Sequence, residues 1–331
     1  MPRLVTDEYD ELVHYTSANG LMGILTSQCL WATHADYLND ADEIKTFFDR
    51  RLRNLIDNEV RSAIAELAKI PHNQQLVNDL GGIEKTVADT ADGLTKSIRH
   101  STLNFNQPYI LSFCGAKDER IRANGLLSQW RGYGKDGGYA IVFDTQALQL
   151  LLESEANNFH YQHIEWGDVH YYDEMSDDSP LAEEIQEAEA TLRASIVAFM
   201  KNKRPEDLEP TYGAVTTLSC LYKHWGFHEE REVRVIAIPP EATVIEAARA
   251  AKIHKQARPL KTLIRDGCPV PYLTLFASEA SNANRQLLPI KRIIVGPHKE
   301  KEQRKQAVEL LLSSNGLRAT VSTSEIPYVG R

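Results

Sequence analysis

The chain has 331 residues, of which 42% are hydrophobic and 25% are charged, together with 14 prolines and 18 glycines. This composition is typical of a globular protein with a sizeable core, and it excludes wholesale disorder. The net charge of −9, from 37 basic and 46 acidic residues, argues against a broad footprint on nucleic-acid backbone, although a local basic groove is compatible with it.

The sequence has no signal for export or membrane insertion. Its first residues lack a basic region followed by an apolar one, and no apolar run approaches the ~20 residues that span a bilayer. We therefore expect a soluble, cytoplasmic protein without a membrane partner. The cysteines are far apart with no Cys-x-x-Cys pair, which predicts neither a disulfide framework nor a thiolate zinc site. These cysteines are Cys29, Cys114, Cys220 and Cys268.

The first predicted elements are a strand and a helix. Residues 12–17 favour a short strand, and Ser17 is placed to cap a helix whose apolar residues recur at helical spacing. Further on, residues 44–67 predict a long amphipathic helix, broken at most once, that ends at Pro71. A more polar helix is expected over residues 83–99. Asp40 and Glu43 stand at capping-box spacing before the long helix.

The middle of the chain favours strands. Residues 109–114 and 139–144 are rich in β-branched and aromatic side chains and flank a glycine-rich connection, part of which fits a hairpin turn over residues 135–138. A helix is expected to start at residue 144 or 145 and run through Leu151. Residues 159–172 resemble one or two strands interrupted at Trp166 and Gly167.

The C-terminal half predicts helices over residues 181–200 and 208–223 and a strand over 231–238. Residues 290–320 predict a β-α-β unit. We find no internal repeat and no long linker. The sequence therefore predicts one α+β domain over residues 1–331, a mixed sheet with helical insertions near 41–105 and 175–225.

Three short segments are candidates for a binding site. The first, His14, Tyr15 and Thr16, ends a strand just before a helix N-terminus, where side chains and backbone N–H groups can face an anionic ligand. A histidine there can donate a hydrogen bond to a ribose hydroxyl. The alternative is a buried histidine followed by a capping hydroxyl.

The second segment, residues 126–139, carries four glycines among Trp130, Arg131 and Tyr133. The aromatic rings are suited to stacking on a base and the arginine to pairing with a phosphate, and glycines let the backbone approach a ligand closely. A hairpin explains the glycines at the end of this run but not Trp130 and Arg131.

The third segment is Phe227-His-Glu-Glu-Arg-Glu-Val-Arg-Val235. If it is a strand, a period of two places Glu230, Glu232 and Arg234 on one face. Neighbouring carboxylates raise one another's pKa unless a cation or a ligand compensates, which makes Glu230 and Glu232 candidate catalytic residues. The alternative is a salt-bridged face in which Arg231, Arg234 or Lys223 supplies the compensating charge.

Common catalytic and metal motifs are absent from the sequence. It contains no Walker loop, no Gly-x-Gly-x-x-Gly and no Gly-x-Ser-x-Gly. His224 and His228 lack the zincin glutamate, and the other histidines show no metal-ligand spacing. We therefore expect no metal.

Several of these motifs resemble a bacterial family described as a domain of unknown function, number 2971. The resemblance runs from residue 14 to 297 and implies no particular reaction. It rests on His14-Tyr-Thr-Ser, Leu30-Trp-Ala with Tyr37-Leu-Asn-Asp40, Leu127-Ser-Gln-Trp-Arg-Gly-Tyr-Gly134, Phe227 with Glu230-x-Glu232-x-Arg234, and Ile294-Val-Gly-Pro297.

The sequence also loosely resembles ADP-ribosyltransferases. In these enzymes a split NAD-binding sheet carries a His or Arg on its first strand, an aromatic residue or Ser on a middle strand, and a late acid. His14 matches the first position and Glu232 the late acid, with Glu230 completing a Glu-x-Glu pair. Tyr133 and Tyr139 compete for the middle position.

This resemblance implies an enzyme that cleaves the nicotinamide–ribose bond of NAD and transfers ADP-ribose to an unknown protein or nucleic-acid acceptor, in a toxin or defence setting. Glu232 would stabilise the oxocarbenium-like state and Glu230 would orient the acceptor. His14 with Tyr15 and Thr16 would hold a ribose. Arg131 or Arg234 would meet the pyrophosphate, and Trp130 or Tyr133 would stack on nicotinamide.

Two other functions are compatible with these residues. One is a sensor module that binds a nucleotide without turning it over. The other is a metal-dependent nuclease or phosphoesterase that uses Glu230, Glu232, Asp40 and nearby histidines.

Overall fold

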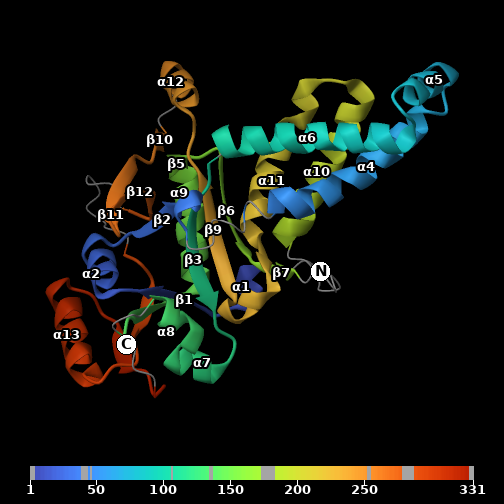
Figure 1. The fold of residues 1–331 in the computed structure, drawn as a ribbon. Coiled ribbons are helices and arrows are strands. Elements are labelled where there is room, and N and C mark those ends of the chain that lie inside the picture. The colour runs from blue at the N-terminus through green and yellow to red at the C-terminus, as the bar shows by residue number, and fades with distance from the viewer. Residues whose placement is uncertain are drawn as a thin grey trace.

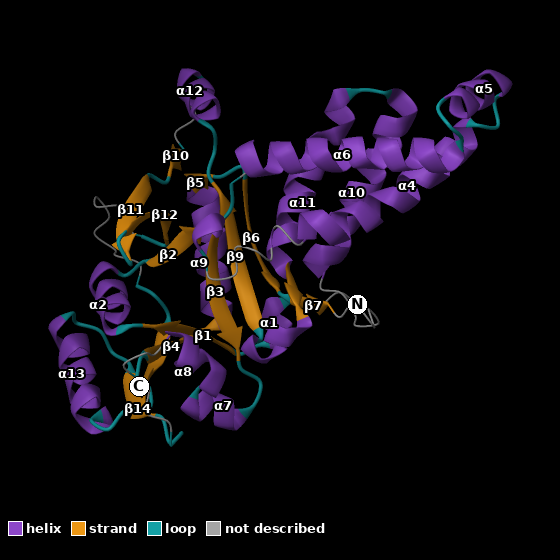
Figure 2. Ribbon diagram, in the orientation of Figure 1, coloured by secondary structure: helices purple, strands orange, loops and turns teal. Residues whose placement is uncertain are grey.

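A mixed sheet of ten strands runs through the molecule (Figures 1 and 2). We analysed a computed structural model, which describes residues 4–38, 44, 47–105, 107–133, 137–172, 183–251, 255–277 and 287–327. The strand order is β11-β12-β2-β3-β1-β4-β13-β14, and β9 joins β3 to β6. The strands are β1 (Glu11–Thr16), β2 (Leu30–His34), β3 (Tyr109–Gly115), β4 (Tyr139–Asp144), β6 (His163–Asp168), β9 (Glu232–Ile238), β11 (Leu260–Arg265), β12 (Cys268–Leu275), β13 (Ile290–Val295) and β14 (Thr320–Thr323).

Helices cover both faces of this sheet and extend beyond it. Two short strand pairs lie outside it: β5 (Phe159–His160) with β10 (Gln256–Ala257), and β7 (His170–Tyr172) with β8 (Tyr222–His224). The helices are α1 (Val5–Glu8), α2 (Ala18–Ser27), α4 (Leu52–Leu67), α5 (Pro71–Asp79), α6 (Ile83–Phe105), α7 (Glu119–Asn124), α8 (Leu127–Tyr133), α9 (Thr145–Asn158), α10 (Glu183–Asn202), α11 (Glu209–Leu221), α12 (Ala242–Ala250) and α13 (Lys301–Ser314). Short 3-10 or π segments are η1 (Ala35–Tyr37), η2 (Phe47–Arg51), η3 (Pro205–Leu208) and η4 (Trp225–Glu230).

The described parts of the two predicted insertions are helical, and they pack against each other. Helices α4, α6, α10 and α11 gather on one side of the sheet, with α5 at their far end (Figure 1). Their buried residues, such as Ile56, Leu192 and Val215, form one cluster with Ile110 of β3 and Ile236 of β9. The helices thus close one face of the sheet at the end of β3 where Ile110 lies.

Most elements expected from the sequence are present. Ser17 accepts a hydrogen bond from the Gly20 amide at the start of α2, and Asp144 caps α9 in the same way. The C-terminal β-α-β unit forms, with β13 and β14 parallel. The predicted capping pair Asp40 and Glu43 lies outside the described residues. The predicted mixed α+β fold is therefore confirmed.

One local prediction was incomplete and another was wrong. The long helix ends before Pro71 as predicted, but Pro71 also occupies the first turn of α5, where a missing N–H costs nothing. Strand β6 is also not interrupted at Trp166 and Gly167: the break comes at Val169. Gly167 instead provides space, since a Cβ there would lie 2.6 Å from the side chain of Leu221 in α11.

The predicted hairpin between β3 and β4 is also wrong, because β1 lies between these strands and pairs antiparallel with both. The glycines at the end of the connection still adopt the expected positive φ, 95° at Gly137 and 58° at Gly138. The local sequence indicated the turn, but it did not indicate that the N-terminal strand β1 lies between β3 and β4.

The sheet is split along one edge of β3. Strand β1 pairs with one end of that edge, through Val13 opposite Cys114, and β2 pairs with the other end, through Thr33 opposite Ile110. In the described pairings neither strand reaches residues 111–113 from that side. The opposite edge of β3 pairs with β9 along its length. A gap therefore opens in the middle of the sheet, on the edge of β3 opposite to β9.

Candidate functional site

A pocket lies at this split, and polar side chains from several separate parts of the chain reach it, six of which form its candidate centre. Strand β1 contributes one residue, β3 another, α8 a third, and the η4–β9 segment three more. These residues are His14, Ser112, Gln129, Glu230, Glu232 and Arg234.

His14 stands where β1 leaves β3. Its Nδ1 lies 2.9 Å from the carbonyl oxygen of Ser112, and its ring contacts Phe113 edge-on with centroids 5.9 Å apart. Burial lowers the pKa of His14, although the hydrogen bond to Ser112 opposes this. Since a carbonyl only accepts, Nδ1 carries the proton of the neutral ring and Nε2 is an acceptor. The Nε2 atom of His14 is thus suited to accept a hydrogen bond from a hydroxyl group rather than to donate one.

Glu232 is the first residue of β9 and is held in place by two cations. Arg234 donates from Nε to Oε1 at 2.8 Å and from Nη2 to Oε2 at 2.9 Å. The ammonium of Lys223 lies 3.1 Å from Oε2. Burial alone would raise the pKa of Glu232, but the charges of Arg234 and Lys223 outweigh it and lower the pKa to about 2. This carboxylate is therefore ionised throughout the neutral range.

Lys223 joins the two glutamates of the motif. Its side chain is completely buried, and Nζ lies 2.8 Å from Oε2 of Glu230 as well as 3.1 Å from Glu232. The ammonium also lies 4.8 Å from the centre of the Phe227 ring. A lysine is buried at this depth only when it is paired, and here it pairs with both carboxylates. Lys223 and Arg234 thus supply the compensating charge that the sequence required.

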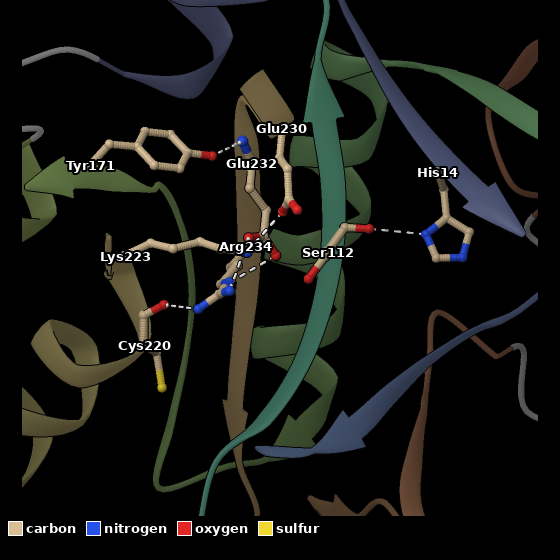
Figure 3. A network of polar contacts seen from close by, with 8 residues as sticks. All are labelled: His14, Ser112, Tyr171, Cys220, Lys223, Glu230, Glu232 and Arg234. Atoms are coloured by element: carbon tan, nitrogen blue, oxygen red, sulfur yellow. Dashed lines mark hydrogen bonds and ion pairs between the residues drawn. The ribbon is translucent and has the colours of Figure 1, made fainter. Parts of the chain in front are cut away.

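The strand predicted over residues 231–238 is present as β9, but it does not extend back over Glu230, as a single strand face for the Glu-x-Glu motif would require. Glu230 ends the short helix η4, and Arg231 adopts a left-handed conformation with φ 44° before β9 begins. The two carboxylates still converge, because both bind Lys223 (Figure 3). Glu230 keeps 27% of its side chain exposed and Glu232 only 9%. Of the pair, Glu230 is the more accessible.

Backbone contacts hold this cluster against its surroundings. The hydroxyl oxygen of Tyr171 in β7 accepts a hydrogen bond from the backbone N–H of Glu232 at 2.8 Å (Figure 3). Arg234 donates a hydrogen bond of 2.7 Å to the carbonyl oxygen of Cys220, at the end of α11. The side chain of Ser112 also helps to lower the pKa of Glu232. Ser112 therefore contacts His14 through its carbonyl and acts on Glu232 through its side chain, and so connects the two walls of the pocket.

The sequence gave one weak signal for Ser112: it is the lone polar side chain in the run Tyr-Ile-Leu-Ser-Phe-Cys of β3. A polar residue inside a buried strand needs a partner, so that interruption can mark a site. Sequence reasoning missed it, and it also missed Gln129, which precedes Trp130 on α8 and lines the pocket.

The structure places the other predicted ligand-binding residues apart from this centre. Tyr15 lines the pocket, but its hydroxyl oxygen already accepts a hydrogen bond from the backbone N–H of Leu126. Trp130 is 1% exposed, packs edge-on against Tyr15 at 4.9 Å, and donates its indole N–H to the carbonyl of Asn124. Trp130 is therefore a core residue that anchors α8 and cannot stack on a ligand from this position.

Three predicted residues remain at the margin. Thr16 ends β1, and its hydroxyl occupies the space where a side chain at Gly20 would lie. Arg131 is exposed on α8, and Tyr133 ends that helix, with its side chain outside the described part of the structure. Tyr139, the other candidate for the middle aromatic position, is buried in β4 opposite Thr16 and Val295.

Over the described ranges, no group of three or more His, Cys, Asp or Glu side chains is arranged to hold a metal ion. The two carboxylates of the site bind the ammonium of Lys223 where a shared metal would otherwise lie. Asp40, which the nuclease hypothesis requires, lies outside the described residues.

No helix in the described part of the chain is long and apolar enough to cross a membrane.

Comparisons with known proteins give one match, to a family model over part of the chain. Neither a search of curated proteins nor a search of solved structures returned a match. Residues 129–235 match the model of a family described as a protein of unknown function (DUF2971). The match begins on α8 and ends in β9, so it includes Glu230, Glu232 and Arg234, whereas His14 lies outside it. The resemblance to this family expected from the sequence is thereby confirmed over residues 129–235.

Proposed function

We propose that this protein binds NAD at the split of its sheet and cleaves the nicotinamide–ribose bond, passing ADP-ribose to an acceptor. One observation carries the proposal: His14, Ser112 and Glu232 come from three strands and join through Ser112 at the gap between β1 and β2. A split sheet with a His on its first strand, a Ser on a middle strand and a late acid is the arrangement that the resemblance to ADP-ribosyltransferases implies. Ser112, rather than Tyr133 or Tyr139, fills the middle position.

In this proposal, the bond between ribose C1′ and the nicotinamide nitrogen breaks and its electron pair leaves with nicotinamide. The ribose becomes oxocarbenium-like before the acceptor attacks C1′. Glu232 accepts a hydrogen bond from a ribose hydroxyl and stabilises the positive charge that develops on the ring. Its pKa of about 2 keeps it ionised for this role.

Lys223 and Arg234 reduce the net charge of the site, because they balance Glu230 and Glu232 one for one. Their contribution is orientation: Arg234 fixes both oxygens of Glu232, and Lys223 holds the two carboxylates side by side. A carboxylate fixed before the reaction has no rotational freedom to lose as the charge develops.

Glu230 is the better placed of the two to meet the acceptor, because more of its side chain is exposed. It takes the proton that the acceptor releases when the new bond to C1′ forms. The neutral His14 offers Nε2 to a ribose hydroxyl. Arg131, exposed on α8, is the candidate for the pyrophosphate. The acceptor in this proposal is a protein or a nucleic acid.

The experiment is to incubate the purified protein with NAD, with and without cell lysate, and to measure free nicotinamide. We expect release by the wild type and a loss of at least 100-fold in Glu232→Gln, which removes the ionised carboxylate. Glu229→Gln is the matched control, because Glu229 belongs to the same sequence motif and is exposed, but it does not line the pocket. Wild-type activity in Glu232→Gln would reject this role for Glu232.

The same assay separates the two other functions. A sensor module would bind NAD and release no nicotinamide under any condition. A metal-dependent enzyme would lose its activity with chelator, whereas the proposed reaction is chelator-insensitive.

A further inference from the structure

We infer that Trp31 is the surface on which the adenine base of NAD stacks, at the end of the pocket away from Glu232. This inference rests on the proposed function for the identity of the ligand. The structural observation behind it is independent: Trp31 is an exposed aromatic side chain that lines the same pocket as the two glutamates.

The register of the sheet places Trp31 on the same face as the catalytic candidates. Thr33 of β2 pairs with Ile110 of β3, and Ser112, two residues along β3, pairs with Arg234 of β9. Directly paired residues share a face, as do residues two apart on one strand. Trp31 is two residues from Thr33, so it belongs to the face that carries Ser112, Glu232 and Arg234.

Trp31 is also held in place. Its ring contacts that of Tyr272 on β12, with centroids 4.8 Å apart and the planes tilted by 36°. The indole remains 39% exposed, although its strand neighbours Leu30 and Ala32 are completely buried. A tryptophan fixed by a second ring but left partly exposed in a pocket has the properties of a stacking platform for a base.

A positive charge lies in the same pocket. Arg265 lines it, and its guanidinium donates to the carbonyl of Tyr37. An aromatic ring and a guanidinium in one pocket suit a base and a phosphate, the two features that adjoin in a nucleotide.

The distance across the sheet decides which base of NAD reaches Trp31. Strand β2 is separated from β9 by β3, which puts the two strands roughly 10 Å apart at the usual spacing of about 4.8 Å. If Glu232 contacts the nicotinamide ribose, the nicotinamide attached to it lies beside Glu232 and Ser112. The second base, adenine, is the one that extends toward Trp31.

The test measures binding by isothermal titration with three probes: ADP-ribose, AMP and nicotinamide mononucleotide. We expect Trp31→Ala to weaken ADP-ribose and AMP binding about tenfold, because base stacking on an aromatic side chain contributes at that scale, and to leave nicotinamide mononucleotide within twofold of wild type. Trp31→Phe should restore most of the affinity. Ile264→Ala is the control, since Ile264 is 71% exposed on neighbouring β11 and does not line the pocket.

Three results would overturn the inference: no binding of ADP-ribose or AMP by the wild type at millimolar concentration, wild-type AMP affinity in Trp31→Ala, or a loss confined to nicotinamide mononucleotide. Equal unfolding midpoints of the variants exclude misfolding as the cause. Nicotinamide release without any effect of Trp31→Ala on AMP or ADP-ribose binding would reject the inference alone. Loss of AMP binding in Trp31→Ala without nicotinamide release by the wild type would reject the proposed reaction alone.

Discussion

At the scale of single residues, the site depends on a balance of four buried or half-buried charges. Two carboxylates separated by one residue in sequence would repel each other, and a buried carboxylate without a partner is costly. Lys223 and Arg234 remove both problems, and their hydrogen bonds fix the geometry of Glu232. The compensation is internal, so the cluster is formed before any ligand binds.

Removing the shared cation should therefore destabilise the fold. We expect Lys223→Met to lower the free energy of unfolding at pH 7 by about 3 kcal/mol, because it leaves two carboxylates close together at a partly buried site. The loss should be smaller at pH 3, because Glu232 without the charge of Lys223 takes up a proton more readily there than in the wild type. Urea unfolding at both pH values measures it. Lys69→Met is the control: Lys69 pairs with Glu66 at the surface, where we expect no measurable change. A larger loss at pH 3 than at pH 7 would contradict this account.

Glu232 should also make stability depend on pH in the acid range. Its folded pKa of about 2 lies below the ordinary glutamate value of 4.5, so its contribution is present above pH 4.5 and is lost as the pH falls toward 2. Unfolding free energies measured across this window should fall more steeply in wild type than in Glu232→Gln. A residual slope is expected in the variant because Arg292 lowers the pKa of Glu11 to about 2 despite opposing burial. Identical slopes would show that Glu232 is not held ionised by its partners.

The sequence identified Glu230, Glu232 and Arg234 as a group, because charged residues that recur at every second position can be recognised without a structure. It assigned Trp130 to ligand binding because aromatic residues near glycines suit both a core and a site. The two uses differ only in burial, which local sequence does not determine. Ser112 was missed for the converse reason: its role depends on a contact with His14, which is 98 residues away.

At the scale of elements, close backbone approaches position the strands around the pocket. Gly296 follows β13, and a Cβ at this position would lie 1.6 Å from the carbonyl oxygen of Gly137. The Gly296 amide also donates to the carbonyl of Gly138 at 3.0 Å. The glycine-rich connection before β4 is thus fitted against the end of β13, close to the buried Trp130.

This packing can be tested with a pair of glycine substitutions. Gly296→Ala should destabilise the protein by several kcal/mol, because the atom that the new methyl group would meet is backbone and cannot move aside alone. Gly93→Ala in α6 should instead stabilise it by about 0.5–1 kcal/mol, since the site is open and alanine is the better helix former. Thermal unfolding of both variants checks this. A Gly296→Ala protein as stable as wild type would mean that the loop is not packed as described.

Strands and helices with strong periodicity were predictable, as in β3, β4, α2 and α13. Their boundaries and the short elements were less so: the sequence placed Lys223 at the end of a helix, but it lies in β8. Strand β8 has only three residues, too few to show an alternation of apolar and polar side chains. Its position is set by its parallel pairing with β7.

At the scale of the whole molecule, function depends on topology. The split arises because β1 and β2 are joined by α2 yet pair with opposite ends of the same edge of β3. The helices of the two insertions then close one end of the exposed face, and α8 covers the other (Figure 1). Non-local pairing of this kind was not predictable from local patterns, which suggested a simple β3–β4 hairpin.

The measurement that tests the account most directly is the rate of nicotinamide release from NAD by Ser112→Ala, since Ser112 connects the two walls of the split. Ser62→Ala is the control, because its hydroxyl lies on the exposed surface of α4 and bonds only its own helix. We predict a rate at least 100-fold below wild type for Ser112→Ala, an unchanged rate for Ser62→Ala, and the same unfolding midpoint for both. A wild-type rate in Ser112→Ala, or no nicotinamide release by the wild-type protein with acceptor present, would contradict the account.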